Sequence, residues 1–496
     1  MDKERRVVLQ SGAIGAAIAG ASAIFPRAFA QPASAQSTSK SGDSMRGQSI
    51  TNLKRRLSNG SVTSRQLVED ALAAINDPNG EGKASFIKVH AEKALQTADA
   101  SDAQRKKGLA VPSLSGIPIS VKDLFDEAGE TTLGGSTVLI GQPAAAQDAT
   151  VVRRLREAGA IIIGRTNTVE FAYTGLGINP HYGTPKNVFD RATGRIPGGS
   201  TSGGAISVAD GMAAAAIGTD TGGSLRIPSG LNGLVGFKPT QGRVSRDGVM
   251  PLSSSFDSAG AIGWTVEDCA FLDGIIADQK LEPSVPLTAK QLRLAVPQTY
   301  FQNELSPEVA KAFGAALSKL SAAGAKIVEL PMTEFAMTPT INPKGMITAS
   351  EAYAWHRKFI KDGADKYDPR VLARIKTGET ILAADYVDLQ TLRREFIRKI
   401  NAAAKGFDAM LMPTTPDIAP PISEVLKDDE TYYRINGRML RNPSAVNIFD
   451  GCALSVPCHE SGEAPVGLMV AGTQNQDQHI LAAGRAIEAV VAPKRG

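Results

Sequence analysis

The chain has 496 residues, of which 42% are hydrophobic and 21% are charged, so it is long and apolar enough to bury a large core. Its formal net charge is +4. Residues 1–30 contribute +2 of this charge, because they contain four basic side chains (Lys3, Arg5, Arg6 and Arg27) and two acidic ones (Asp2 and Glu4). The +2 that remains is too small for an electrostatic footprint on nucleic acid, so we expect no nucleic-acid partner.

The cysteines and histidines show no metal-ligand pattern. Cys269, Cys452 and Cys458 lack paired spacing, and their odd number excludes a fully paired set of intramolecular disulfides. The five histidines are scattered and form no H-E-x-x-H motif. We therefore expect free, buried cysteines and no metal site.

The N-terminus resembles a twin-arginine signal peptide. Arg5 and Arg6 precede a mildly apolar run over residues 12–25, and small residues follow at Ala28–Ala30 and Ala33–Ala35. The run is shorter than the ~20 residues of a membrane-spanning helix, and acidic residues argue against a mitochondrial leader. We predict a signal peptide over residues 1–30, with cleavage after residue 35 as the alternative.

The predicted leader bears on where the mature protein is located and on how the rest of the chain is divided. The mature protein is expected in the periplasm without stable membrane association, or in the cytoplasm if the leader is not a signal. Residues 31–47 are rich in Ser, Gln and Gly and predict a flexible lead-in. No internal repeat or linker divides residues 48–496, which we expect to form one domain.

Helical and strand patterns then alternate along the chain. A capped helical pattern covers Thr63–Leu72, and the short apolar run Ile117–Asp123 predicts a buried strand with Lys122 at its end. Helix-then-strand units follow, with further short apolar strands: helices 150–159 and 307–323, strands 160–164, 292–296, 326–330, 410–412 and 466–470. This alternation predicts an α/β fold with a parallel or mixed sheet covered on both faces, and the helix-prone stretch 353–405 predicts a lid or subdomain.

Two glycine-rich turns carry serines that suit nucleophilic catalysis. A predicted strand runs to Asp220, and the chain then turns sharply at Thr221 into Gly222-Gly223-Ser224. Such a turn directs the Ser224 hydroxyl and the backbone N–H groups of the turn toward one point. A carbonyl bound there would have its developing oxyanion stabilised while the serine attacks.

Ser224 needs a base, and Lys122 is the candidate. Burial at the end of a strand lowers the pKa of a lysine and makes the neutral, basic amine accessible. Ser200, in the first glycine-rich turn (Gly198–Gly204), would relay the proton between Ser224 and Lys122. Asp220, Arg226 and Ser202 are expected to support these groups; for Asp220 and Arg226 we favour stiffening of the turn over contact with substrate.

A phosphate loop, a nucleophile elbow and a flexible linker fit the glycine-rich segments less well. There is no G-x-x-x-x-G-K-[ST] phosphate loop, and neither serine lies in a G-x-S-x-G elbow. A flexible linker is the ordinary origin of a Gly/Ser cluster. Here the cluster leads directly into an apolar segment that ends in a second Gly-Gly-Ser turn, which is not typical of a linker.

These motifs resemble the amidase signature family. Residues 198–240 are similar to its long Gly/Ser-rich signature, Gly116–Asp123 to its lysine strand, and Pro465–Gly472 to its C-terminal strand. The resemblance implies one α/β/α domain around a mixed, twisted sheet, with Ser224 as nucleophile, Ser200 after a cis peptide bond and Lys122 as base. It also implies an oxyanion hole from the amides of Thr221, Gly222, Gly223 and Ser224. Thr201 and Ile206 depart from the common pattern without affecting these positions.

The resemblance implies an amidohydrolase for small-molecule linear amides that uses an acyl-enzyme and no cofactor. Alternatives are the A-type glutaminase subunit of a tRNA-dependent amidotransferase, an esterase or aryl acylamidase and, in a different class, an exported solute-binding protein. Large soluble enzymes are often symmetric, so a homodimer is one expectation. We expect the substrate pocket to involve three variable regions, Tyr173–Tyr182, Phe301–Trp355 and Tyr432–Asn442.

Overall fold

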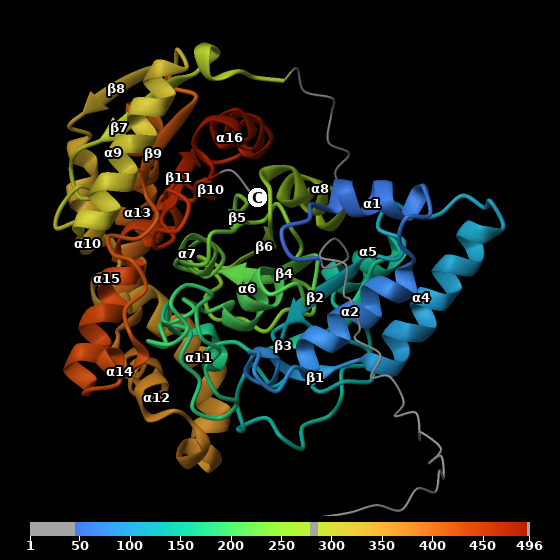
Figure 1. Cartoon of the computed structure of the whole chain (residues 1–496). Helices are drawn as coiled ribbons and strands as arrows, with labels where there is room; N and C mark the ends of the chain where they lie inside the picture. The colour runs from blue at the N-terminus through green and yellow to red at the C-terminus, as the bar shows by residue number, and fades with distance from the viewer. Residues whose placement is uncertain (1–44, 278–285, 494–496) are drawn as a thin grey trace, which may run out of the picture. The chain divides into compact units, whose positions relative to one another are not determined.

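An eleven-stranded mixed sheet runs through the part of the chain that the computed structural model describes, residues 45–277 and 286–493 (Figure 1). These residues belong to one compact unit, residues 42–496. The strands are β1 (Phe86–Val89), β2 (Pro118–Lys122), β3 (Ile161–Thr166), β4 (Ala215–Asp220), β5 (Val235–Lys238), β6 (Ser258–Gly263), β7 (Arg293–Pro297), β8 (Lys326–Leu330), β9 (Ala409–Pro413), β10 (Cys452–Pro457) and β11 (Gly467–Gly472). The predicted leader, and the lead-in up to residue 44, lie outside the described residues.

The sheet combines parallel and antiparallel pairs. Its spatial order is β1-β3-β2-β4-β6-β5-β10-β11-β9-β7-β8. Strand β2 pairs in parallel with β3 and β4, and β7 pairs in parallel with β8 and β9, whereas the other pairings are antiparallel. This confirms the predicted mixed sheet.

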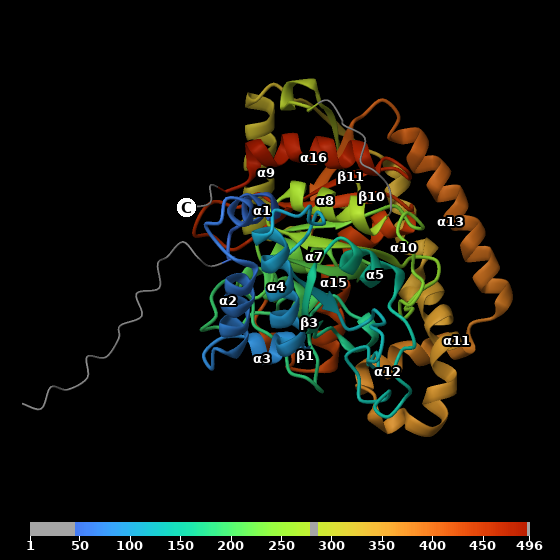
Figure 2. The ribbon, with the colours of Figure 1, turned by 90° about the vertical axis from the view of Figure 1, so that its right-hand side faces the viewer.

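Helices cover both faces of the sheet. The α-helices are α1 (Ile50–Ser58), α2 (Ser64–Asn76), α3 (Gly82–Ser85), α4 (Ala91–Lys106), α5 (Thr150–Glu157), α6 (Ser202–Ala209), α7 (Arg226–Leu231), α8 (Val266–Ile276), α9 (Pro307–Ala322), α10 (Thr338–Ile341), α11 (Met346–Gly363), α12 (Pro369–Lys376), α13 (Ala383–Ala403), α14 (Ile422–Val425), α15 (Asp429–Ile448) and α16 (Asp477–Val491). Helices α8 and α16 lie on one side, and α6 and α7 on the other (Figures 1 and 2). The single α/β domain with helices around a large sheet is therefore confirmed.

The elements predicted from sequence patterns are present. The first predicted helix is α2, whose preceding residue, Thr63, caps it by accepting a hydrogen bond from the Gln66 N–H. The predicted strand with Lys122 is β2, and all five of its residues are buried. The stretch 353–405 forms most of α11 together with α12 and α13; α11 and α13 run along one flank in Figure 2.

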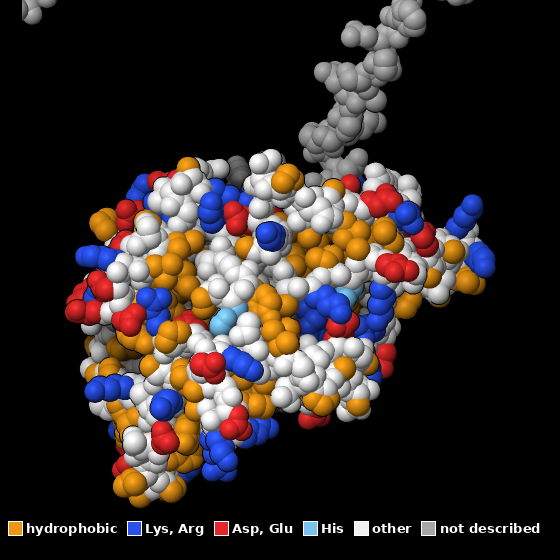
Figure 3. Space-filling model, turned by 90° about the horizontal axis from the view of Figure 1, so that it is seen from below, with side chains coloured by type: hydrophobic (Ala, Val, Ile, Leu, Met, Phe, Trp, Pro, Cys, Tyr) orange, Lys and Arg blue, Asp and Glu red, His pale blue; other side chains and the backbone are white. Residues whose placement is uncertain are grey.

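The remaining composition-based predictions concern cysteines, metals and charge. All three cysteines are free and buried, as predicted. Within the described residues, no group of three or more metal-ligating side chains is suited to a metal ion, and no helix is long and apolar enough to cross a membrane. On the face seen in Figure 3, basic and acidic side chains are interspersed among hydrophobic ones.

The topology brings the two motif-bearing strands together. Because β2 and β4 are parallel neighbours, Lys122 at the end of β2 and Asp220 at the end of β4 emerge at the same edge of the sheet. Helix α6, which follows the first glycine-rich turn, packs on β4 and β2. Both glycine-rich turns therefore meet at the carboxyl ends of these strands, where ligands commonly bind in α/β sheets.

Candidate active site

Lys122 and Ser200 are in direct contact. The Lys122 side chain is fully buried, and its Nζ donates to the Ser200 Oγ at 2.7 Å and to the Thr219 Oγ1 at 2.9 Å. The Gly199–Ser200 peptide bond is cis, as the family resemblance implies. Thr219 lies on β4 and had not been singled out from the sequence.

Burial lowers the pKa of Lys122 to about 7, although Asp220 and Asp257 partly oppose this shift. A substantial fraction of the side chain is therefore the neutral amine near neutral pH, and the neutral amine is the form that can accept a proton.

Ser224 is almost completely buried, with 3% of its surface exposed, but it lines a cavity of about 650 Å³. Its backbone carbonyl accepts a hydrogen bond from the Thr201 N–H at 3.2 Å, which joins the two glycine-rich turns. In the described part of the chain, the Ser224 hydroxyl forms no hydrogen bond. The structure thus brings Ser200 to Lys122 and places Ser224 in the wall of the cavity.

The predicted oxyanion amides do not share one environment. Thr221, Gly222 and Ser224 line the cavity. Gly223 differs from the prediction, because its N–H donates to the Asp220 Oδ1 at 2.9 Å and the residue is not part of the lining. The available amides are consequently those of the other three residues.

Asp220 and Arg226 form a fully buried ion pair beneath the turn. The Arg226 Nη2 and Nε donate to the Asp220 Oδ1 and Oδ2 at 2.9 and 3.0 Å. Although burial alone would raise it, the pKa of Asp220 is held well below its ordinary value by Arg226. Asp220 also accepts from the Leu225 N–H at 3.1 Å, and Arg226 is not part of the cavity lining. These contacts favour the stiffening role.

Further hydrogen bonds fix the backbone around the two serines. The Ser202 N–H donates to the Ser200 carbonyl at 2.9 Å, at the start of α6, whereas the buried Ser202 hydroxyl has no partner among the described residues. The Thr221 hydroxyl donates to the Asp257 Oδ1 at 2.5 Å. Asn447, on α15, donates to the Asp220 Oδ1 at 2.9 Å, so this helix also supports the turn.

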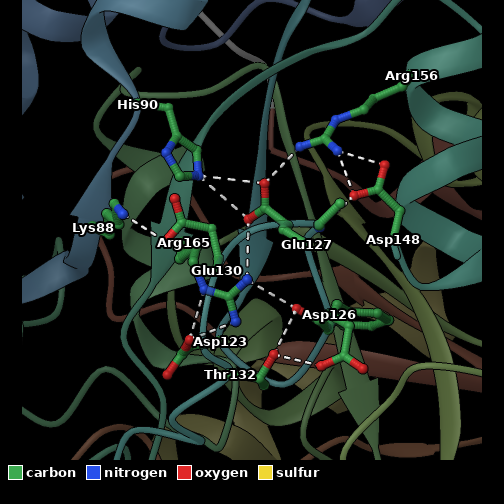
Figure 4. Close-up of polar contacts among 12 residues, drawn as sticks. Lys88, His90, Asp123, Asp126, Glu127, Glu130, Thr132, Asp148, Arg156 and Arg165 are labelled. Carbon is green, nitrogen blue, oxygen red and sulfur yellow. Dashed lines mark hydrogen bonds and ion pairs between the residues drawn. The ribbon is translucent and has the colours of Figure 1, made fainter. Parts of the chain in front are cut away.

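An ion-pair network includes Asp123, the residue that follows Lys122 in the chain (Figure 4). The buried Arg165 contacts Asp123, the residue after Lys122, at 2.7 Å and Glu127 at 3.2 Å. Glu127 continues the network to Arg156 at 2.8 Å and to His90 at 3.3 Å. Burial raises the pKa of Asp123, an effect that Arg165 opposes. The end of β2 is therefore tied to β3 through paired charges.

The cavity is enclosed by segments from distant parts of the chain. Members of all three predicted variable regions contribute to it: Tyr173 and Thr174; Thr338, Pro339, Asn342, Lys344, Gly345 and Thr348; Tyr433, Asn436, Gly437, Leu440 and Arg441. Sequence reasoning had not assigned its apolar members Leu252, Phe256 and Ile448, nor Tyr300 and Arg374. A cavity of this size accommodates a small organic molecule.

Comparisons with known proteins agree with this geometry. The family model described as "Amidase" matches residues 66–481. A "2-amino-5-chloromuconic acid deaminase" from Comamonas testosteroni is 34% identical over an alignment of 406 residues that covers 80% of this chain and 87% of that protein. The A-type subunit of a glutamyl-tRNA(Gln) amidotransferase from Chloroflexus aggregans is 34% identical over 473 residues, covering 88% and 94%. A solved structure, "Crystal structure of amidase", aligns with a TM-score of 0.80 at 33% identity, covering 89% of this chain and all of that one.

Proposed function

Because the chain belongs to the amidase family, we propose that it hydrolyses a carboxamide through an acyl-enzyme on Ser224. The chain is an amidohydrolase, since the relatives that share its fold and most of its length act on C–N bonds. The observation that carries the proposed mechanism is the buried contact between Lys122 and Ser200 beside the cavity that Ser224 lines. No cofactor is required for this chemistry.

Acylation begins with proton removal. The Ser224 Oγ attacks the amide carbonyl carbon as its proton passes to the Ser200 Oγ, which passes its own proton to the neutral amine of Lys122. The carbonyl oxygen becomes an oxyanion, and the N–H groups of Thr221, Gly222 and Ser224 are the proposed donors to it. A single donor of this kind is typically worth about 10²- to 10³-fold in rate.

The same groups return the proton. The protonated Lys122 donates through Ser200 to the leaving nitrogen, so that ammonia or an amine departs as the C–N bond breaks. A water molecule then attacks the acyl carbon, its proton follows the same route to Lys122, and the carboxylate product is released with regeneration of the Ser224 hydroxyl. The pKa of about 7 supports this double role, because Lys122 exchanges protons readily near neutral pH.

The test does not require a known substrate. A fluorophosphonate should add once to the wild-type protein, as measured by intact mass, and should not add to the Ser224→Ala variant. Ser444, the other serine of the cavity lining, provides the matched control, and Ser444→Ala should keep the adduct. Labelling of Ser224→Ala would contradict the assignment of the nucleophile.

A second candidate is the glutaminase component of an amidotransferase. It is favoured by the similarity to the amidotransferase protein of Chloroflexus aggregans, nearly all of which this chain matches. A free-standing amidase releases ammonia without a partner, whereas a glutaminase component would pass the ammonia on to another reaction. Ammonia release by the isolated chain, measured with a panel of amides including glutamine, separates the two candidates.

We also propose export through the N-terminal leader, based on Arg5, Arg6 and the small residues that end at Ala30. Cell fractionation of the wild type against a variant with both arginines changed to lysine tests this, and equal distribution of the two would contradict it. A homodimer remains our proposal for the assembly, and sedimentation velocity distinguishes it from a monomer.

A further inference from the structure

The charged side chains that line the cavity are all basic. They are Lys344, Arg374 and Arg441, and the described residues of the lining include no Asp or Glu. None of these three side chains forms an ion pair with another described residue. Lys344 is exposed, and Arg374 and Arg441 are partly buried. A cavity wall whose charged side chains are all positive attracts anions, so it indicates that a negative group arrives with the substrate.

Helix α12 shows the contrast between a paired and an unpaired arginine. Arg370, one turn before Arg374, is neutralised by Asp429 at 2.7 Å. The Arg374 guanidinium lies over the ring of Tyr173 at 4.6 Å and donates to the Tyr173 carbonyl, but it has no carboxylate partner in the described part of the chain. Its contacts hold it against the cavity wall without cancelling its charge.

Helix α15 also carries one arginine with carboxylate partners and one without them among the described residues. Arg438 contacts carboxylates of Asp417 and Glu304 and is not part of the lining. Arg441, three residues later, donates only to neutral oxygens within the described chain: the Asn442 Oδ1 at 2.9 Å, the Asn303 carbonyl at 2.7 Å and the Phe301 carbonyl at 3.3 Å. The side chain is thus held in place, while the nearby carboxylates of Glu304 and Asp417 form their ion pairs with Arg438 and not with Arg441.

We propose that Arg374 and Arg441 bind a carboxylate on the substrate, so that the protein selects carboxamides carrying a second, anionic end. A carboxylate matches the fork of a guanidinium and needs only two N–H donors, which suits arginines that already share some of theirs with backbone oxygens. The apolar lining residues Leu252, Phe256 and Ile448 fit an aliphatic or aromatic spacer between the two ends. This proposal rests on the proposed amidase function and specifies its substrate class.

Matched amides test the proposal. Succinamic, glutaramic and adipamic acids are compared with neutral amides in which an isopropyl group replaces the carboxylate, and kcat/KM is measured by ammonia release. The wild type should prefer the acidic member of a pair by about 10- to 100-fold, the range expected for one or two hydrogen bonds to a charged group. Arg374→Gln or Arg441→Gln should abolish most of this preference, whereas Arg370→Gln and Arg438→Gln should retain it.

The ratio of the two rates separates recognition from folding, because a folding defect lowers both rates together. A wild type without preference for the acid, or a preference that survives in both Arg374→Gln and Arg441→Gln, would overturn the proposal. The affinity of the Ser224→Ala variant for the same amides, measured by calorimetry, tests anion recognition separately from the proposed amidase function. Tighter binding of the acids without hydrolysis by the wild type would support anion recognition and contradict the amidase mechanism. Hydrolysis of the neutral amides alone would support the amidase mechanism and contradict anion recognition.

Discussion

Lys122 Nζ lies 2.9 Å from the Thr219 Oγ1 as well as 2.7 Å from the Ser200 Oγ, so two hydroxyls orient the proposed base. Thr219→Val removes one acceptor and keeps the volume. We expect the pKa of Lys122 to fall, since the acceptor stabilises the ammonium more than the amine, and the pH midpoint of fluorophosphonate labelling to fall with it. On the high-pH plateau, where the amine is neutral in both proteins, the labelling rate should drop by about 10-fold because the base has lost one of the two hydroxyls that orient it. Thr219→Ser should restore the wild-type rate. Identical pH profiles for Thr219→Val and the wild type would contradict this role.

The pH dependence of labelling should follow Lys122. Its pKa of about 7 means that the ammonium dominates below pH 7 and the neutral amine above it. Because only the neutral amine accepts a proton, the labelling rate should rise with pH and level off above about pH 8. Lys122→Arg, whose guanidinium stays charged, should be inactive throughout. A rate that is constant on both sides of pH 7 in the wild type would exclude Lys122 as the titrating base.

The same lowered pKa makes a prediction for stability. The unfolded lysine titrates near 10.5 and the folded one near 7, so between these values the unfolded state binds the extra proton. The free energy of unfolding should therefore increase with pH across this window. Lys122→Met removes the buried amine and should flatten this increase, measured by urea unfolding at several pH values. An unchanged slope in the variant would show that other groups cause it.

Much of the fold could be predicted because the relevant signals are local. The alternation of α2, β2, α5 and β3 follows from short apolar runs and a cap at Thr63, and these patterns require no knowledge of distant contacts. The residues of the candidate site could be predicted from the sequence for a related reason. Lys122, Ser200 and Ser224 occupy glycine-rich turns and a strand end, and their spacing is itself a sequence motif.

The residues that sequence reasoning missed depend on strand order and on distant helices. Thr219 meets Lys122 only because β4 is the parallel neighbour of β2, which a single sequence does not indicate. Arg374 is separated from Ser224 by 150 positions and reaches the cavity through helix packing. The predicted oxyanion hole included Gly223. The Gly223 N–H instead donates to the Asp220 carboxylate, and no residue pattern in the sequence indicates this local hydrogen bond.

The Asp220–Arg226 pair should matter for stability far more than a surface pair. Arg226→Met leaves Asp220 buried without its partner, and we expect a loss of about 3–5 kcal/mol in the free energy of unfolding, together with slower labelling of Ser224. The exposed pairs of Arg65 with Glu69 and Asp99 are the control, and Arg65→Ala should lower the free energy of unfolding far less than Arg226→Met does. Equal losses in the two variants, measured by urea unfolding, would contradict a special role for the buried pair.

Arg165 should influence the site without touching the substrate, because it holds Asp123 immediately after the proposed base. Arg165→Met leaves the fully buried Asp123 without its counter-ion, so we expect the free energy of unfolding to fall by about 3–5 kcal/mol. If the end of β2 also shifts, the labelling rate of Ser224 should fall and its pH midpoint should move, effects that global destabilisation alone would not produce below the unfolding transition. Lys88→Met removes only the separate, half-exposed pair with Glu130, which Figure 4 shows beside this network, and should change neither quantity measurably. A normal rate and midpoint in a folded Arg165→Met protein would limit the network to a structural role.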